Sequence, residues 1–180
     1  MNLRDTDLEW MASNFPELVY QSADRCIVGR LHFCAAFDRD TGQLKLGDTK
    51  THRAIGTFLC DTFEVRYDLD CSQRNGWPKV YEVGGRRYNI ANQNRCGMID
   101  LHFFGDGACC MGLKHAVERN LTLKRFTNEL VIPFFYRLTY TDSYGLTAAR
   151  NDLWGEYPQW RRRHTRVHRR VAEYSKQRTQ

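Results

Sequence analysis

Residues 55–69 constrain the fold more than any other stretch of the chain, because apolar and charged residues alternate along them. The apolar positions of the second half are Phe63, Val65, Tyr67 and Leu69, and the charged residues between them are Glu64, Arg66 and Asp68. A period of two residues is that of a β-strand with one face on a core and the other in water. The stretch therefore predicts an antiparallel sheet and excludes an all-helical fold.

Further segments extend this strand into a meander. Residues 26–37 alternate in a similar way, and residues 79–83 form a short strand-like run that Gly84 and Gly85 end. A helix is expected before the first strand, because Leu8, Met11 and Phe15 recur on one helical face. The first half of the chain is thus predicted to be a helix followed by antiparallel strands.

The second half has the pattern of helices. Residues 86–99 are rich in Asn and are expected to be irregular. Residues 121–140 are expected to form a helix with a kink or boundary at Pro133, and the apolar side of this helix contains Leu123, Phe126, Leu130, Phe134 and Leu138. A turn is expected at residues 142–145, and residues 147–157 have helical character.

We therefore expect one α+β domain over residues 1–157 and a basic helical C-terminal extension over residues 158–180. The formal net charge of the 180-residue chain is +6, but the extension contains eight Arg or Lys residues and one acid. Its charge of +7 leaves −1 for the domain, which argues against nucleic acid as the partner of the domain. The extension is interpreted either as a solvated helix or as a docking surface for an acidic partner or for phosphate groups.

The lengths of the apolar runs and the number of cysteines bear on the cellular compartment in which the chain is expected. No apolar run reaches the roughly 18–20 residues that span a bilayer, and no apolar signal segment follows Met1. The chain is therefore expected to be cytoplasmic and to make no membrane contact. Because the number of cysteines is odd, seven, a disulfide framework is not expected and most thiols should be reduced. Cys26, Cys34 and Cys60 are interpreted as small buried hydrophobic residues.

Residues 96–113 combine the most reactive side chains with a turn. His102 precedes a Gly-Asp-Gly turn at residues 105–107, and Cys109 and Cys110 follow it. Strands are expected upstream and a helix downstream. A thiol on a loop between a sheet and a helix is a candidate nucleophile.

Metal and cofactor binding are not expected. The soft metal ligands in and near this stretch are Cys96, His102, Cys109, Cys110 and His115. Structural zinc sites favour Cys pairs two to four residues apart, whereas adjacent cysteines point apart. The chain also contains no Gly-x-x-x-x-Gly-Lys phosphate loop.

Two reactions remain for the thiol of Cys110. In a hydrolase, His102 or His115 would act as its base, with Asp100 or Asp106 orienting the histidine. In an acyl carrier, the thiolate would attack an activated carbonyl carbon. The carrier needs access, positioning and a hydrogen-bond donor for the oxyanion, and a turn of small residues provides room for a partner's chain.

Several motifs distinguish these possibilities. They are Trp77-Pro78-Lys79-Val80-Tyr81-Glu82, Gly84-Gly85-Arg86, Asp100-x-His102, Asp106-Gly107-x-x-Cys110-x-Gly112 and Asp152-Leu153-Trp154-Gly155-Glu156-Tyr157. Together they resemble the ubiquitin-conjugating enzymes, and most closely the bacterial ubiquitin-conjugating-like proteins of antiphage defence operons. The resemblance covers residues 3–157. It implies the ubiquitin-conjugating fold, with an N-terminal helix, a four-stranded antiparallel meander and C-terminal helices.

The resemblance also assigns the site residues. It implies that Cys110 is the catalytic cysteine and that His102 is the motif histidine, which organises the loop more than it acts as a base. The family has an Asn two residues after this histidine, where this chain has Phe104. That Asn assists the loop and the oxyanion, so Asn92, Asn94 or a backbone N–H is required in its place.

The implied function is transfer of a protein's C-terminal glycine. Cys110 takes the acyl group as a thioester and passes it to an amine, in bacterial antiviral defence. The implied donor is a ubiquitin-like protein or a cyclic-nucleotide synthase, and a separate activating protein would consume the ATP. The alternative is a non-catalytic binding or scaffold module for a defence-operon partner.

Overall fold

Two 13-residue antiparallel strands, β2 (Cys26–Asp38) and β4 (Gly56–Asp68), form the centre of the computed structural model. The structure describes residues 4–38, 43–54, 56–70, 78–111 and 122–154. Strands therefore form where residues 26–37 and 55–69 predict them. The alternation also holds, since Phe63, Val65 and Tyr67 are buried while Glu64 and Arg66 are exposed.

Three short strands complete an antiparallel sheet of order β1-β2-β4-β5. They are β1 (Leu18–Gln21), β3 (Gln43–Leu46), which pairs with the end of β2, and β5 (Lys79–Glu82). The strand predicted at residues 79–83 is thus confirmed. Its partners in β4 are the last four residues of that strand, from Val65 to Asp68.

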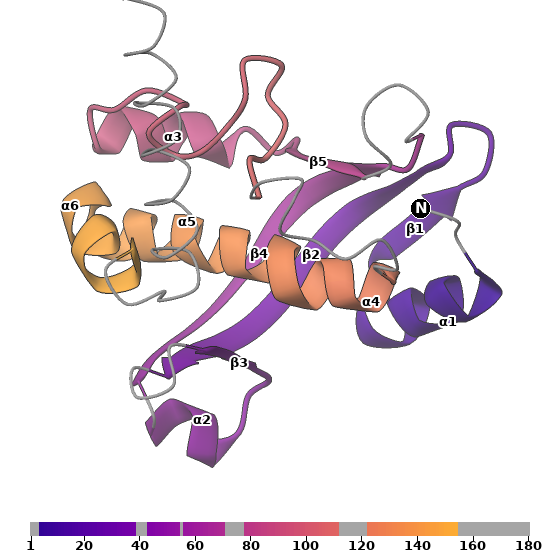
Figure 1. Cartoon of the computed structure of the whole chain (residues 1–180), viewed down its shortest axis with the longest axis horizontal. Coiled ribbons are helices and arrows are strands. Elements are labelled where there is room, and N and C mark those ends of the chain that lie inside the picture. The colour runs from indigo at the N-terminus through magenta and orange to yellow at the C-terminus, as the bar shows by residue number, and fades with distance from the viewer. Residues whose placement is uncertain (1–3, 39–42, 55, 71–77, 112–121, 155–180) are drawn as a thin grey trace, which may run out of the picture.

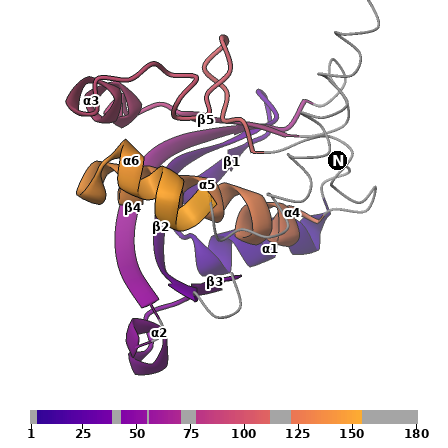
Figure 2. The ribbon, with the colours of Figure 1, turned by 60° about the vertical axis from the view of Figure 1, so that its left-hand side comes forward.

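Helices cover one face of the sheet. The helical segments are α1 (Asp5–Asn14), α2 (Lys50–Ala54), α3 (Arg86–Gln93), α4 (Leu123–Phe126), η2 (Thr127–Val131), α5 (Ile132–Tyr144), α6 (Leu146–Ala149) and η3 (Arg150–Trp154). In Figures 1 and 2, α4, η2 and α5 follow one another across β2 and β4, and α3 lies beyond β5. The expected mixed α+β architecture, with an antiparallel sheet and C-terminal helices, is therefore observed.

The predicted apolar side of the long helix lies in the core. Leu123, Phe126, Phe134 and Leu138 are buried, and Leu130 packs against them partly buried. The expected boundary at Pro133 is also found, because this residue stands in the first turn of α5. Pro133 has no N–H for the carbonyl of Glu129, and the preceding segment η2 has π-helical hydrogen bonds.

Two expectations about local structure are wrong. Residues 86–93 are not irregular but form α3, whose first amides are bound by a side chain from the preceding strand. The carboxylate of Glu82 accepts from the backbone N–H groups of Arg86 and Arg87, both at 3.2 Å. Asp142 is not in a turn either, because α5 continues to Tyr144 and Asp142 binds Arg86.

The interpretation of Cys34 and Cys60 as buried reduced residues is also wrong. They are directly opposite each other in the β2–β4 ladder and form a disulfide. Cys34 is half-buried and Cys60 is exposed, because both lie on the face of the sheet that carries the charged residues. Cys26 is buried, as expected, and its thiol is free.

Other expectations fall outside the described residues or concern membranes. The basic extension at residues 158–180 lies outside the described residues. Among the described helices, none combines the length and the apolar character that crossing a bilayer requires.

A cluster of ions joins β4, α3 and α5. The guanidinium of Arg86 binds the carboxylates of Asp61 and Asp142, and the hydroxyl of Thr139 donates to Asp61 at 2.6 Å. Both carboxylates are largely buried, at 13% and 23% exposure. The Arg86 guanidinium also lies over the ring of Phe63, 4.7 Å from its centroid. This cluster fixes the first turn of α3 against the sheet.

Replacing Arg86 by Ala is expected to lower the free energy of unfolding by about 2–4 kcal/mol, because two largely buried carboxylates lose their cation. Arg125→Ala is the matched control. It removes an exposed pair with Glu129 within one helix and should cost less than about 1 kcal/mol. Urea denaturation followed by circular dichroism measures both losses. Equal losses in the two variants would contradict the role given to Arg86.

Candidate active site

The predicted site lies on a hairpin-like loop beside β5, at residues 103–110 (Figure 1). Phe103 pairs with Cys109 across the loop, and Ala108 pairs with Tyr81 of β5. The N–H of Phe104 donates to the carbonyl of Ala108 at 2.8 Å. Gly107 adopts φ +81°, a conformation that favours glycine. The sequence Gly-Asp-Gly thus forms the expected tight turn.

His102 and Cys110 meet at the base of this loop. The backbone N–H of Cys110 donates to the carbonyl of His102 at 2.7 Å, and both residues are half-buried. His102 adopts φ +62°, which is uncommon for a residue with a side chain. The structure therefore brings the two predicted site residues together through their backbones.

The two adjacent cysteines have opposite environments. Cys109 is 4% exposed, its N–H donates to the carbonyl of Val80 at 2.7 Å, and burial raises the pKa of its thiol far above the usual range. Burial likewise raises the pKa of the nearby Tyr67 hydroxyl. Cys110 is half-buried. Of this pair, Cys110 is therefore the more exposed residue.

Arg87 of α3 holds the loop against the end of β5. One of its nitrogens, Nη1, donates to the carbonyl of Glu82 at 2.7 Å and to that of Gly107 at 3.2 Å. Its guanidinium also lies over the ring of Phe103, 5.4 Å from the centroid. Sequence reasoning missed Arg87, because the helix that carries it was expected to be irregular. No local signal marks α3, since its capping carboxylate belongs to a strand residue.

A second cation fixes the tip of the turn. Lys79 Nζ lies 2.5 Å from Asp106 Oδ2, and the hydrogen bond to this carboxylate raises the pKa of Lys79. The other carboxylate oxygen of Asp106 accepts from the N–H of Ala108 at 3.1 Å. Asp106 therefore holds the turn, which weakens its candidacy as the acid that orients a histidine.

Asp100 is engaged in a similar way. Its carboxylate accepts from the N–H of Gly97 at 3.0 Å and binds Arg150 at 2.6 Å. Each of the two acids considered for a hydrolase thus binds one cation from another element and one backbone amide of its own loop. The alternative base His115 lies outside the described residues.

The Asn residues proposed to replace the missing family Asn differ in their contacts. The amide of Asn94 donates to the carbonyl of Ile90 at 2.9 Å and accepts from the N–H of Leu146 at 2.8 Å. It therefore connects α3 to α6. Asn92 is exposed on α3, and Phe104 is 53% exposed beside the turn.

Metal ligands are not gathered at the loop. Among the described residues, no three His, Cys, Asp or Glu side chains are arranged to hold a metal ion.

Comparison of the chain with protein-family models, with curated proteins and with solved structures finds no significant match.

Replacing Arg87 by Ala is expected to loosen the loop. Amide hydrogens in residues 101–110 should exchange about tenfold faster, because the carbonyl of Gly107 loses its donor and the loop loses its tie to β5. Hydrogen exchange followed by mass spectrometry measures this change. Lys124→Ala, at an exposed position of α4, is the control that should leave the loop unaffected. Unchanged exchange in Arg87→Ala would contradict the role of Arg87 in holding the loop against β5.

Proposed function

We propose that the protein is a ubiquitin-conjugating-like acyl carrier that forms a thioester on Cys110. The observation that carries the proposal is the contrast between the half-buried Cys110 and the buried Cys109. The order of the elements supports it as well, since a helix, an antiparallel sheet, the cysteine loop and helices follow one another. This order is compatible with the ubiquitin-conjugating fold.

The reaction is an acyl exchange. The Cys110 thiolate attacks the activated carbonyl carbon at a protein's C-terminal glycine, and the activating group leaves. An amine then attacks the thioester carbonyl, forms an amide and releases the thiol. ATP is consumed by a separate activating protein. The proposed donor is a ubiquitin-like protein or a cyclic-nucleotide synthase, and the proposed setting is antiviral defence in the bacterial cytoplasm.

The loop has the access that such a donor needs. Among the described residues, a Cβ built on Gly105 would meet nothing within 4 Å, so none of them blocks the approach to the turn at this position. Glycine residues let a partner's backbone come close. The N–H groups of Phe104, Gly107, Ala108, Cys109 and Cys110 already donate within the protein, so an oxyanion on Cys110 needs a donor other than these five. Arg87 and Lys79 hold the turn in one position, which reduces the cost of ordering it when the donor binds.

A second candidate is a binding or scaffold module that performs no transfer. Two observations favour it. Phe104 stands where the family's Asn assists the oxyanion, and Asn94 is bound to Ile90 and Leu146. The two candidates predict different outcomes when the thiol is removed.

The decisive test is intact-mass analysis of the full chain with the proteins of its operon and ATP. Acyl carriage predicts a hydroxylamine-labile adduct that is lost in Cys110→Ala and retained in Cys109→Ala. If no adduct forms and the partner binds Cys110→Ala as tightly as the unchanged protein, the scaffold candidate is correct. An adduct that dithiothreitol removes and hydroxylamine does not is a disulfide, and it also refutes the thioester.

The role of His102 is tested by two substitutions. His102→Gly and His102→Asn both tolerate the positive φ and preserve the carbonyl that binds the N–H of Cys110. Adduct formation is expected to remain within about threefold of the unchanged rate, because a loop organiser acts through its backbone. A general base contributes roughly 10²–10⁴-fold, so a hundredfold loss in both variants would instead make the imidazole part of the chemistry.

A further inference from the structure

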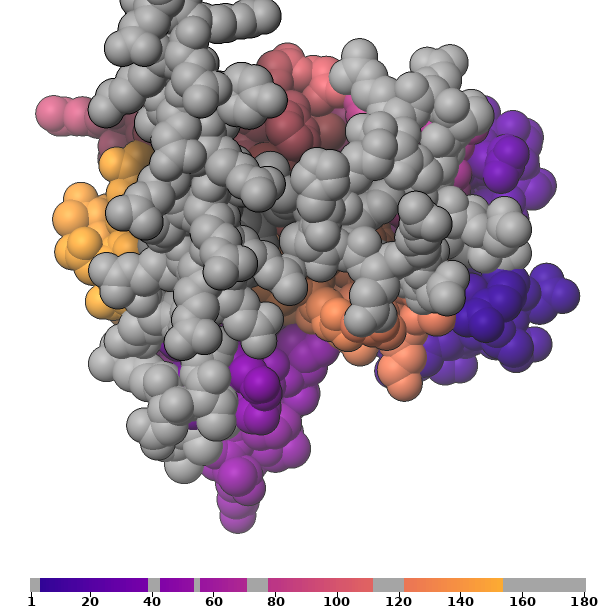
Figure 3. Space-filling view, viewed as in Figure 1, coloured from indigo at the N-terminus to yellow at the C-terminus, as the bar shows by residue number. Residues whose placement is uncertain are grey.

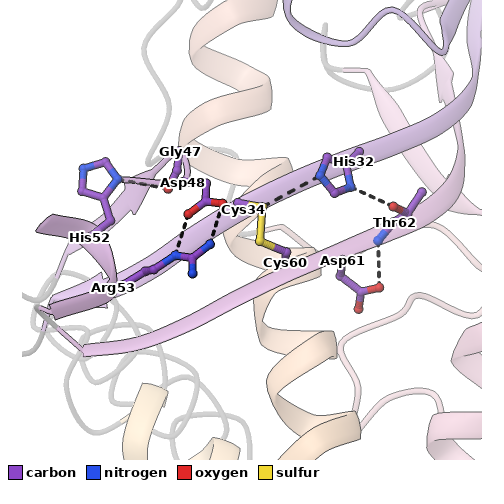
Figure 4. The surroundings of a disulfide bond; sticks show 9 residues. All are labelled: His32, Cys34, Gly47, Asp48, His52, Arg53, Cys60, Asp61 and Thr62. Carbon is purple, nitrogen blue, oxygen red and sulfur yellow. Dashed lines mark hydrogen bonds and ion pairs between the residues drawn. A yellow bond between two sulfur atoms is a disulfide. The ribbon is translucent and has the colours of Figure 1, made fainter. Parts of the chain in front are cut away.

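The disulfide between Cys34 and Cys60 lies on the outer face of the sheet, away from Cys110 in the sequence and independent of the proposed function. The two cysteines are opposite each other in β2 and β4 (Figure 4). Cys60 is exposed and Cys34 is half-buried. The sulfur of Cys60 is therefore the one that a thiol from solution reaches first.

His32 lies beside Cys34, the more buried of the two cysteines. It precedes Cys34 by two residues in β2 and is on the same face of the sheet. Its Nε2 is 3.8 Å from Cys34 Sγ, and its Nδ1 is 2.9 Å from the hydroxyl of Thr62 (Figure 4). When the Thr62 hydroxyl donates to Nδ1, the ring proton is on Nε2 and faces the sulfur. A thiolate at Cys34 would therefore have a hydrogen-bond donor in place.

We propose that Cys34 and Cys60 form a thiol–disulfide exchange site for small cellular thiols such as glutathione. The thiolate of the small molecule attacks Cys60 Sγ and forms a mixed disulfide, while the Cys34–Cys60 bond breaks. The electron pair of that bond goes to Cys34, where His32 stabilises the leaving thiolate. A second small thiol then attacks the mixed disulfide, which releases Cys60 and the oxidised small-molecule disulfide. One protein disulfide and two thiols thus give one protein dithiol and one small disulfide.

The surrounding sheet permits this reaction in the folded protein. The β2–β4 ladder continues on both sides of the cysteine pair, from Cys26↔Asp68 to Asp38↔Gly56. Breaking the covalent bond therefore leaves the strands paired. Disulfides of cytoplasmic proteins are usually transient and serve catalysis or redox sensing, so an exchange site is consistent with the compartment proposed above.

The test measures reduction of the oxidised full chain by glutathione. Samples are quenched with acid and N-ethylmaleimide, then digested with trypsin, which separates Cys34 in residues 31–39 from Cys60 in residues 54–66. The proposal predicts loss of the linked peptide pair without unfolding. The transient mixed disulfide should be found on the peptide of Cys60.

His32→Gln is expected to slow this reduction by about threefold or more, because a less stabilised thiolate leaves more slowly. His52→Gln is the matched control, since His52 binds the carbonyl of Gly47 at 3.0 Å and lies away from the sulfurs (Figure 4). Circular dichroism checks that both variants are folded. The proposal is overturned if glutathione leaves the bond intact in the folded protein, if His32→Gln reacts at the unchanged rate, or if the mixed disulfide forms on Cys34.

Discussion

The buried carboxylate of Glu82 connects the sheet to the candidate active site. A carboxylate that is 1% exposed is costly to bury without partners, and here it accepts from two amides at the start of α3, where the helix dipole also favours a negative charge. The position of α3 then determines where Arg87 lies. The guanidinium of Arg87 donates to the backbone carbonyls of Glu82 and Gly107. The turn before Cys110 is therefore positioned by an interaction that begins at the end of β5. In the space-filling view of Figure 3, salmon atoms of the segment before Cys110 lie at the top of the molecule, above the orange atoms of the C-terminal helices.

The strands could be predicted from the sequence, and α3 could not, for one physical reason. Alternation is a local property, so residues 55–69 reveal both the strand and its buried face without reference to any other part of the chain. The start of α3 depends on Glu82, which lies before two glycines and is not among the residues that usually cap helices through their own side chains. Asp142 differs, because its partner Arg86 lies 56 residues away along the chain. A strand side chain four residues upstream thus decides the start of α3, and a contact between distant segments decides the role of Asp142.

The cysteine pair shows a signal that was present in the sequence and was not used. Cys34 has the same parity as Arg30 and His32, and Cys60 has the parity of Glu64 and Arg66. Alternation therefore places both cysteines on the face that carries these charged residues, which argues against a buried hydrophobic role. The pairing itself depends on the register of β2 against β4, which the sequence does not state. An odd number of cysteines argues against a complete disulfide framework, but it does not exclude one bond between adjacent strands.

The same period of two explains why Cys110 is the more exposed member of the adjacent pair. Cys109 occupies a β-bridge with Phe103, and its backbone also binds β5, so its side chain points into the core. In extended backbone the next side chain points the other way, which brings Cys110 towards solvent. Burial also disfavours the thiolate of Cys109, because it raises the pKa of that thiol, and the thiolate is the form of cysteine that acts as a nucleophile. The buried cysteine is thus poorly placed to react with a molecule from solution, and the orientation of the two side chains leaves Cys110 as the more exposed of the pair.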